Sequence, residues 1–443
     1  MTVSIIGSGR VGLCLGTLIA QSGQKVLITD KVPDKKEIFK GKLPFYEPQL
    51  TDSLFANKDL LKWTRQVDLI LSSEMIFFCL SFKPDKKIGD FDLSELLEWV
   101  KLIPKSLEEK LLILKSTCPL GTYEKVSEIT KGKNLSVVIC PEFLREGQAL
   151  EDLKKPERVV IGSKNISSGK KLEAFYKSFC KAKQFIHSDP ETVELSKLAC
   201  NSFLGTKISF INEWAGLCEK RGGNMTDFQK ILGSDSRIGK DFLTPGLGYG
   251  GYCLPKDIQL SIIEGQKRKL KMNLLQSVQD VNNELPEIFF KQIQSYYKKL
   301  NKVSLAFWGI SFKKNTDNIK NSPALKLCSK LLKAGVHLHV YDPLFTKEAV
   351  VKIFHKDSEN KDLDDLVKKI FEGKVFFYPS AKESLKQKQG LIVAGDSKEF
   401  KRVSLDSIKN HLSSAFLVDA RCLYFAKDLK KKGFTFYQRG IAR

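Results

Sequence analysis

This sequence has no long apolar run and no closely paired cysteines, and it has few histidines. No stretch reaches the roughly 18 consecutive apolar residues that a membrane-spanning helix needs. Five histidines are scattered along the chain, and the ten cysteines include no CxxC pair, so we expect neither a metal site nor a disulfide framework. Met1 leads almost directly into an apolar segment, without the pattern of a signal sequence. These absences predict a cytoplasmic protein without a membrane span.

The composition, by contrast, is sufficient for large folded cores. The chain has 443 residues, of which 42% are hydrophobic and 28% charged, so two or three globular domains are expected. The formal net charge of +22 comes from 73 basic and 51 acidic residues. We interpret this excess as a solvated surface whose field favours a polyanionic small substrate. A nucleic-acid-binding surface is the alternative, which charge alone motivates, and we expect no nucleic-acid partner.

The N-terminal residues predict a strand, a glycine-rich turn and a helix. The turn is Gly7-Ser8-Gly9-Arg10-Val11-Gly12, and Asp30 ends the next predicted strand. Glycines allow a tight turn and the close approach of a pyrophosphate to the helix N-terminus, while an acidic residue about 20 positions later can accept hydrogen bonds from the adenosine ribose. The pattern predicts a dinucleotide site; the alternative is a purely structural glycine turn.

Three further apolar runs alternate with helical stretches, as expected for a parallel sheet covered on both faces. The runs are 75–80, 111–114 and 137–139. Polar turns follow them at 81–84, 115–119 and 140–142. Because ligands bind beyond the carboxyl ends of parallel strands, we expect these turns to line one crevice.

The pattern becomes helical after residue 188 and returns to alternating strands and helices after residue 301. Helices are predicted over about 190–221 and 273–300, and strands over 303–309, 336–342, 374–378, 390–394 and 415–418. The predicted fold class is α/β, with two Rossmann-like doubly wound domains joined by a central helical section suited to dimerisation. The predicted domains are 1–187, 188–300 and 301–443.

Cys253 follows a glycine-rich segment that a regular helix or strand would not tolerate, Gly246-Leu247-Gly248-Tyr249-Gly250-Gly251. An isolated cysteine is more often a small buried apolar residue. Here the segment predicts a thiol presented on a loop where backbone amides can approach a ligand, so we interpret Cys253 as a nucleophile.

Two pairs of polar residues have the spacing of one helical turn. Lys197 and Asn201 are donors on one face of the predicted long helix and could both point at one oxyanion. Glu142 and Glu146 are spaced in the same way after a predicted strand. For either pair taken alone, a solvated surface is the default interpretation.

Together with these segments, several longer motifs carry a family resemblance. They are Lys115-Ser116-Thr117, Pro141-Glu142-Phe143-Leu144-Arg145-Glu146-Gly147, Ser196-Lys197-Leu198-Ala199-Cys200-Asn201 and Phe312-Lys313-Lys314-Asn315-Thr316-Asp317. From Val3 to about Arg421 the chain resembles the UDP-glucose/GDP-mannose dehydrogenase family, and within it the branch that acts on UDP-glucose. Tyr252 favours that branch, because the N-acetylhexosamine branch typically has histidine before the cysteine.

The resemblance implies an NAD-dependent, four-electron oxidation of the C6 hydroxyl of UDP-glucose to UDP-glucuronate through a Cys253 thiohemiacetal and thioester. It also implies an NAD-binding first domain, a UDP-binding last domain and a homodimer or larger assembly. The implied catalytic residues are Cys253, Lys197, Asn201, Glu142, Asp257 and Thr117. The implied cofactor contacts are Gly7, Gly9, Val11, Gly12, Asp30, Lys35, Lys83, Thr117, Glu146, Lys256 and Lys320. The implied substrate contacts are Glu142, Phe143, Leu144, Arg145, Glu146, Lys197, Asn201, Arg237, Thr244, Gly246, Gly248, Tyr249, Gly250, Lys313 and Arg421, with Arg237 reaching a neighbouring subunit.

The sequence departs from the family pattern near the cofactor. Ser81-Phe82-Lys83-Pro84 stands where Val-Pro-Thr-Pro is usual, and Lys320 stands where an arginine is usual. Lysine lacks the planar fork of arginine, so bidentate pyrophosphate recognition would be lost there. Two alternatives to the UDP-glucose interpretation are the same chemistry on GDP-mannose or a UDP-N-acetylhexosamine, and a catalytically silent nucleotide-sugar binding protein.

Overall fold

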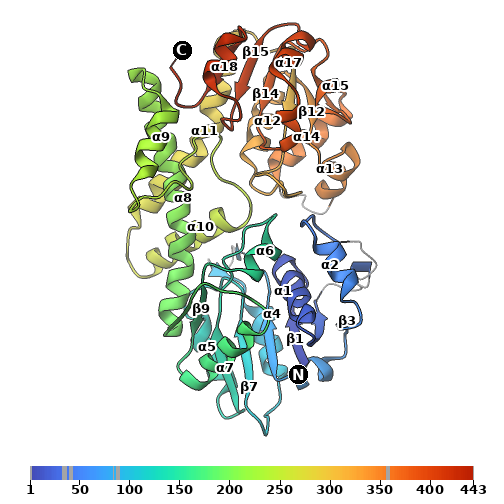
Figure 1. The fold of residues 1–443 in the computed structure, drawn as a ribbon, viewed down its shortest axis with the longest axis vertical. Helices are drawn as coiled ribbons and strands as arrows, with labels where there is room; N and C mark the ends of the chain where they lie inside the picture. The colour runs from blue at the N-terminus through green and yellow to red at the C-terminus, as the bar shows by residue number, and fades with distance from the viewer. Residues whose placement is uncertain are drawn as a thin grey trace. The chain divides into compact units, whose positions relative to one another are not determined.

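The computed structural model describes residues 2–31, 37–38, 43–82, 84–85, 90–355 and 360–442. The chain separates into two compact units (Figure 1). Unit 1 comprises Met1–Cys200 and Ile263–Lys269, and unit 2 comprises Asn201–Ile262 and Leu270–Arg443. No helix among the described residues is long and apolar enough to cross a membrane.

Unit 1 is built on an eight-stranded sheet with the order β10-β9-β8-β7-β4-β1-β2-β3. Its strands are β1 (Thr2–Ile6), β2 (Lys25–Thr29), β3 (Leu61–Trp63), β4 (Met75–Phe78), β7 (Lys110–Leu114), β8 (Leu135–Ile139), β9 (Val159–Gly162) and β10 (Phe185–Ser188). The six strands from β3 to β8 are parallel, whereas β9 pairs antiparallel with β8 and parallel with β10. β5 (Pro84–Asp85) and β6 (Asp90–Phe91) form a separate antiparallel pair.

Helices flank this sheet because its central strands are apolar on both faces and must be covered. All four residues of β4 are buried, as are four of the five in β1. Helix α1 packs beside α6, and α4 packs beside α5. The helices are α1 (Arg10–Gln21), α2 (Leu50–Ala56), α3 (Val67–Ser72), α4 (Ser94–Leu102), α5 (Thr122–Thr130), α6 (Ala149–Lys154) and α7 (Ile166–Lys177). The carboxyl ends of β4, β7 and β8 therefore meet at one edge, as predicted.

The helical section consists of α8 (Pro190–Arg221), α9 (Met225–Ser234), α10 (Cys253–Lys267) and α11 (Asn273–Tyr297). Proline in the first turn and Gly222-Gly223 at the end delimit α8, as the sequence predicts. The boundary between the two units falls within α8 and again within α10.

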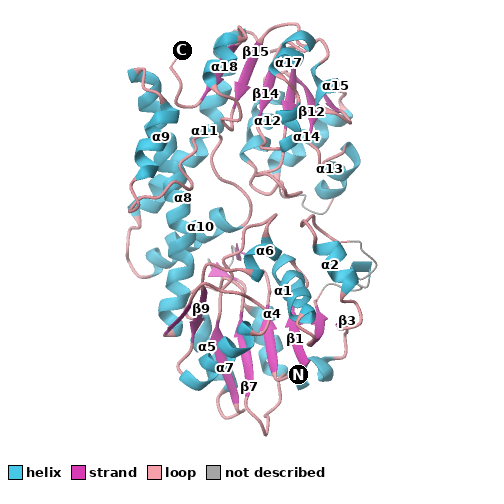
Figure 2. Ribbon diagram, viewed as in Figure 1, coloured by secondary structure: helices cyan, strands magenta, loops and turns pink. Residues whose placement is uncertain are grey.

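The second sheet, in unit 2, has the order β13-β12-β11-β14-β15-β16 and is parallel throughout. Its strands are β11 (Ser304–Trp308), β12 (His337–Tyr341), β13 (Val375–Phe377), β14 (Leu391–Val393), β15 (Phe416–Asp419) and β16 (Thr435–Gln438). Its helices are α12 (Pro323–Lys333), α13 (Lys347–Phe354), α14 (Lys361–Phe371), α15 (Ala381–Leu385), α16 (Lys398–Arg402), α17 (Leu405–His411) and α18 (Ala426–Lys431). Two Rossmann-like sheets with a helical section between them in the sequence confirm the predicted fold class (Figure 2). The exact domain boundaries stay a prediction.

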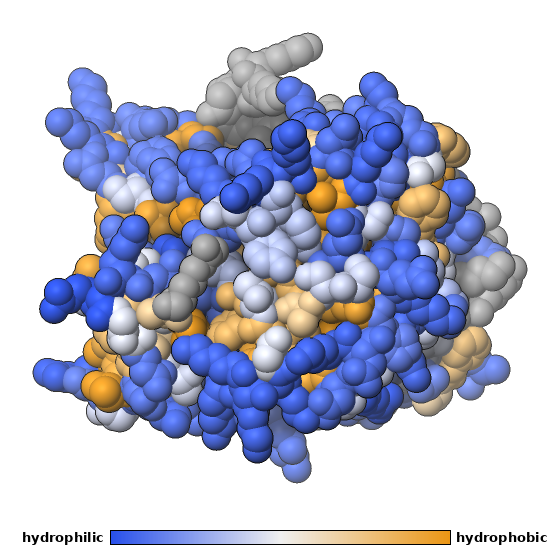
Figure 3. Space-filling view, turned by 90° about the horizontal axis from the view of Figure 1, so that it is seen from above, coloured by the Kyte–Doolittle hydropathy of each residue, from blue (hydrophilic) through white to orange (hydrophobic). Residues whose placement is uncertain are grey.

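Most of the face seen in Figure 3 is covered by hydrophilic side chains, with apolar residues in separate patches. The apolar residues of the strands instead form the cores of the two sheets, which include Phe77 in the first and Phe307 in the second. Apolar side chains are thus concentrated in the interior of each sheet domain, as expected for a globular protein.

Candidate active site

The glycine-rich turn joins β1 to α1 and contacts the residue after β2. Ser8 donates from its backbone N and its Oγ to Oδ2 of Asp30, at 2.8 and 2.7 Å. An added Cβ would lie 2.3 Å from a backbone oxygen at Gly7, but would meet nothing within 4 Å at Gly9. The space at Gly9, the first residue before α1, is therefore open to a ligand at the helix N-terminus, which fits a dinucleotide pyrophosphate. Lys35 and Lys83, two of the predicted cofactor contacts, lie outside the described residues.

Arg10 lies in the same turn and connects two loops that the sequence analysis did not relate. Its guanidinium is 2.9 Å from a carboxylate oxygen of Glu47 and 2.5 Å from one of Glu146. Glu47 also accepts hydrogen bonds from the backbone N of Gly147 and of Ala149 at 2.9 and 2.7 Å. Burial raises the pKa of the Glu47 carboxyl, although these N–H groups and Arg10 favour its ionised form. About 100 residues separate Glu47 from these partners, so no local pattern could have revealed the contact.

The turns after β4, β7 and β8 are tied together by two side chains of one predicted motif. Ser116 Oγ donates to the Leu80 carbonyl at 2.6 Å, and the buried Lys115 donates to the Pro141 carbonyl at 3.3 Å. The half-buried Thr117 follows these two residues in the turn after β7. These bonds bring the three predicted turns to one edge of the sheet.

Glu142 follows β8 and pairs with Lys197 of α8. The Lys197 Nζ lies 3.4 Å from Oε1 of Glu142, and both side chains are largely buried. The same ammonium lies 4.8 Å from the centre of the Phe143 ring. The Leu144 N–H donates to Oε2 of Glu142 at 2.6 Å. A carboxylate and an ammonium are thus fixed in unit 1, as a base and a donor must be for acid–base chemistry.

Two other residues of the Glu142 loop have separate partners. Arg145 is exposed and pairs with Asp152 at 2.6 Å, and Glu146 pairs with Arg10. Arg145 and Glu146 therefore form ion pairs with residues outside this loop and not with each other.

Asp257 is the centre of a second polar cluster, in unit 2. It is fully buried, accepts a hydrogen bond from Asn201 Nδ2 at 2.5 Å, and lies 2.6 Å from Lys256 Nζ. Lys256 and Lys320 lie 5.6 and 5.1 Å from the Tyr252 ring centre, so the two lysines predicted on the cofactor side contact one aromatic ring. Asn201 is one helical turn after Lys197 on α8, as its spacing predicts.

Cys253 is the first residue of α10, and it is the one exposed thiol among the ten cysteines. The prediction that it lies on a loop is wrong, because α10 begins at Cys253 itself. Pro255 in the first helical turn explains this start, since proline has helical φ and needs no N–H partner there. The thiol is therefore at a helix N-terminus, where the helix dipole favours an anionic sulfur.

The glycine-rich segment before Cys253 is held by its backbone. The backbone N–H of Gly246 donates to Asn212 Oδ1 at 2.9 Å, and that of Tyr249 donates to Asn282 Oδ1 at 2.8 Å. A Cβ at Gly246 would lie 2.5 Å from the Ala420 carbonyl oxygen, so this close approach requires glycine. Among the other predicted substrate contacts here, Thr244 is exposed, Gly248 is half-buried and Gly250 is buried.

The remaining predicted substrate residues lie in two further loops of unit 2. Arg421 donates to the carbonyls of Ala394 and Phe312, at 2.7 and 2.9 Å. Lys313, the residue after Phe312, is half-buried. Arg237 is exposed and pairs with Asp235 at 2.6 Å in its own loop. Arg421 thus connects the loops that follow β11 and β14. The contact of Arg237 with a second subunit stays a prediction.

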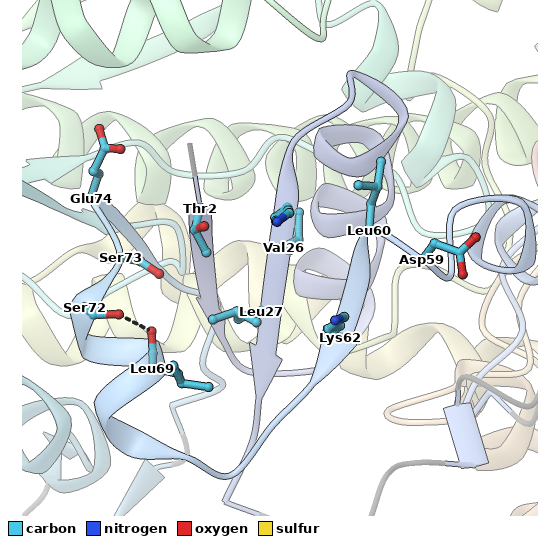
Figure 4. A pocket seen from close by; sticks show the side chains of 11 residues that line it. Thr2, Val26, Leu27, Asp59, Leu60, Lys62, Leu69, Ser72, Ser73 and Glu74 are labelled. Atoms are coloured by element: carbon cyan, nitrogen blue, oxygen red, sulfur yellow. Dashed lines mark hydrogen bonds between the residues drawn. The ribbon is translucent and has the colours of Figure 1, made fainter.

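A surface pocket elsewhere in unit 1 does not belong to this site (Figure 4). Its lining residues include Thr2 and Lys25, which are the first residues of β1 and β2, and Glu74, which precedes β4. The pocket is therefore at the amino ends of the strands, whereas the candidate site is at their carboxyl ends.

Comparisons with known proteins agree with this geometry. Models of the UDP-glucose/GDP-mannose dehydrogenase family match the chain as its NAD binding domain over 1–180, its central domain over 191–284 and its UDP binding domain over 306–426. The UDP-glucose 6-dehydrogenase of Rickettsia prowazekii (strain Madrid E) is 32% identical over 452 residues, which cover 99% of each protein. A UDP-glucose dehydrogenase structure from Pyrobaculum islandicum has a TM-score of 0.85 at 26% identity, covering 100% of this chain and 98% of that one. A UDP-D-ManNAc dehydrogenase structure from Pyrococcus horikoshii has a TM-score of 0.81 at 25% identity, covering 99% of both chains.

Proposed function

Because the chain belongs to the UDP-glucose/GDP-mannose dehydrogenase family and is an NAD-dependent nucleotide-sugar dehydrogenase, we propose that it oxidises the C6 hydroxyl of UDP-glucose to the carboxylate of UDP-glucuronate. The observation that carries the proposal is the position of Cys253. It is the one exposed thiol, it begins a helix, and it lies one helical turn from the buried Asp257.

The overall reaction consumes one UDP-glucose, two NAD⁺ and one water, and yields one UDP-glucuronate, two NADH and three protons. NAD, when bound, accepts the hydride from C6 in each of the two oxidations. Between them, the Cys253 sulfur adds to the C6 aldehyde to form a thiohemiacetal, whose oxidation gives a thioester. Water then hydrolyses the thioester, which releases the carboxylate and restores the thiol.

The residues of the site suit three tasks in this reaction. The turn at Gly7 to Gly12, with Asp30, holds the adenosine and pyrophosphate part of NAD. The Lys197 ammonium and the Asn201 amide donate to the oxyanions that form at C6, and Glu142 exchanges protons with the reacting oxygen and with the hydrolytic water. Asp257 fixes the orientation of Asn201 through their hydrogen bond. Thr117 lies in the turn after β7, at the same edge of the first sheet as Glu142.

Substrate identity is the finer part of the proposal. UDP-glucose is favoured by Tyr252 before the cysteine and by the relatives, because several of those that align with nearly the whole chain are UDP-glucose 6-dehydrogenases. The other candidates are GDP-mannose, UDP-N-acetylmannosamine and UDP-N-acetylglucosamine. The experiment is to measure kcat/KM for all four sugars with NAD and to count the NADH formed per sugar. UDP-glucose with two NADH is expected; a preference for another sugar contradicts the substrate, and absence of turnover with all four contradicts the enzyme function.

We also propose that the chain forms a homodimer or larger assembly through α8. Phe203, Phe210, Trp214 and Leu217 are exposed to between 39% and 63% and repeat at intervals of seven, four and three residues. Such an apolar stripe along one helix is typical of a helix–helix interface. Replacing Phe210 by glutamate is expected to convert the assembly to monomers in light scattering, and an unchanged mass would contradict the α8 interface. A cytoplasmic location stays a prediction.

A further inference from the structure

Glu194 is a buried carboxylate of α8 that none of the steps above uses. Its Oε2 accepts a hydrogen bond from the backbone N of Gly121 at 2.8 Å, and its Oε1 accepts one from Tyr123 N at 2.9 Å. The side chain is 5% exposed, and all three residues belong to unit 1. Both oxygens of one carboxylate are thus committed to the first turn of α5, where backbone N–H groups have no partner within the helix.

Keeping a carboxylate in this position is costly to the fold. Burial raises the pKa of Glu194 to about 7, and the two N–H bonds only partly oppose this effect. The residue that caps α5, Gly121, has no side chain to satisfy these N–H groups itself. Glu194 therefore acts as a cap supplied from a helix about 70 residues away, and an apolar residue would leave two N–H groups unpaired.

The contact joins two parts of the proposed active site. Gly121 ends the turn that begins after β7 and contains Thr117, whereas Lys197 lies three residues after Glu194 on the same face of α8. Lys197 in turn pairs with Glu142 after β8. The Glu194 bonds therefore set how the turn with Thr117 lies relative to the Lys197–Glu142 pair.

We propose that Glu194 is a positioning residue, which holds the turn carrying Thr117 against the part of α8 that carries Lys197. This inference rests on the proposed function, because the roles of Thr117 and Lys197 come from it. Glu194 touches neither substrate nor cofactor in this proposal. It acts by fixing the backbone of the turn.

Glu109 provides a matched control at the opposite end of β7. It also uses its carboxylate for two hydrogen bonds, from the hydroxyls of Ser136 and Ser168, but it precedes the strand that the Thr117 turn follows. Replacing Glu109 removes comparable bonds from the same domain without touching the proposed active site. Any loss that comes only from weakening the domain should appear in both variants.

The test compares Glu194→Ala, Glu194→Gln and Glu109→Ala at pH 8, where the Glu194 carboxyl is ionised. Hydrogen–deuterium exchange of the segment 115–123 is expected to be faster in both Glu194 variants and unchanged in Glu109→Ala. We expect kcat with UDP-glucose to fall by about a hundredfold in Glu194→Ala, because small misplacements of reacting groups have effects of that size. The KM for UDP-glucose should stay within about threefold, and Glu194→Gln, which retains one acceptor, should lie between the extremes.

Unchanged exchange in 115–123, or a fall in kcat no larger than in Glu109→Ala, would overturn the positioning role. If Glu194→Ala does not fold, Glu194→Gln decides between the same outcomes. The wild-type protein separates this proposal from the proposed function. If it does not oxidise UDP-glucose, the function fails, while the exchange measurement still tells whether Glu194 orders the turn.

Discussion

The two Rossmann-like sheets use the residue after their second strand differently. In the first sheet Asp30 follows β2 and accepts hydrogen bonds from Ser8, while remaining half-buried. In the second sheet Asp342 follows β12, is 5% exposed, and accepts from the backbone N–H groups of Ile310, Ser311 and Leu344. The same position is thus proposed to bind the cofactor in one sheet, whereas it supports the fold in the other.

The glycine after the first strand shows that the underlying construction is shared. Gly7 and Gly309 both have positive φ, 109° and 89°, and an added Cβ would lie 2.3 Å from the Cys79 carbonyl oxygen or 2.5 Å from Gly395 Cα. Each loop therefore passes directly over the end of the neighbouring strand, where only glycine fits. The two loops thus begin with the same glycine geometry, and they differ in the side chains and contacts that follow.

The loops at the carboxyl edges also receive different support. In the first sheet the braces are Glu47 and Glu194, which contact backbone N–H groups 71 to 102 residues away. In the second sheet Asp419 at the end of β15 accepts from Arg421 N and Tyr424 N, only two and five residues on. Remote contacts occur in the second sheet as well, because Arg421 donates to the Phe312 carbonyl 109 residues earlier. The remote contacts of Glu47 and Glu194 are made by carboxylates, whereas that of Arg421 is made by a cation.

In the proposed mechanism the reaction depends on residues of unit 1 and of the helical section, so the largest effect should come from the thiol. Cys253→Ser is expected to lower UDP-glucuronate formation by at least about a thousandfold, because a serine hydroxyl is a poor nucleophile at neutral pH and an ester is a poorer intermediate than a thioester. UDP-glucose binding, measured by calorimetry, should persist. The control is Cys218→Ser, a buried thiol of α8 in unit 2 outside the proposed site, which should leave turnover unchanged. Near wild-type acid production by Cys253→Ser would exclude the covalent mechanism.

Replacing Arg10 tests whether its ion pair with Glu47 stabilises the fold. Arg10→Met leaves the buried Glu47 carboxylate without its cation, so the free energy of unfolding should fall by about 3 kcal/mol. Arg145→Met removes an exposed arginine that pairs with Asp152 and should change the free energy of unfolding by less than about 1 kcal/mol. Urea denaturation of both variants measures the difference. Equal losses in the free energy of unfolding would show that the Arg10–Glu47 pair stabilises the fold no more than the Arg145–Asp152 pair does.

The pH dependence of stability distinguishes the buried Glu194 of α8 from the half-buried Glu109, which precedes β7. The pKa of Glu194 is raised from 4.5 to about 7, so its protonated form stabilises the fold, and this contribution is lost as the pH rises to 7 and above. Because Glu194→Gln lacks the titration, its free energy of unfolding should rise relative to wild type by about 3 kcal/mol between pH 4.5 and 8. The pKa of Glu109 is lowered, chiefly by its bond with Ser136, so Glu109→Gln should move in the opposite direction. Parallel curves for Glu194→Gln and wild type would contradict the raised pKa.

The smallest effect concerns the choice of cofactor and tests the contrast between Asp30 and Asp342 directly. NAD should be preferred over NADP, since Asp30 stands where a 2′-phosphate would meet a carboxylate. Asp30→Asn is expected to reduce this preference by about tenfold, whereas Asp342→Asn should lower stability without changing it. Specificity constants for both cofactors decide the matter. A wild-type preference for NADP would show that neighbouring lysines such as Lys31 outweigh Asp30.

Sequence patterns predicted the parts of the fold that depend on neighbouring residues. The predicted strand ends at 80, 114 and 139 lie within two residues of the ends of β4, β7 and β8. The long helix from 190 to 221 and the Lys197–Asn201 spacing also follow from local periodicity, and the structure agrees with them. Local patterns also missed Arg10, Glu47 and Glu194, because each depends on a partner that only the folded chain brings near. The reversed direction of β9 was likewise invisible, since an apolar strand has the same composition in either direction.

The distribution of thiols makes Cys253 addressable by reagents as well as by substrate. Burial raises the pKa of Cys79 to about 12 and that of Cys14 higher still, so these sulfurs stay protonated and shielded from electrophiles. An alkylating reagent used briefly at neutral pH should therefore mark one sulfur per chain and serve as a titrant of intact sites. By the same reasoning, peroxide should convert Cys253 to a sulfenic acid before it reaches the interior cysteines. Exposure to oxidants would then silence the protein while its two sheets remain folded.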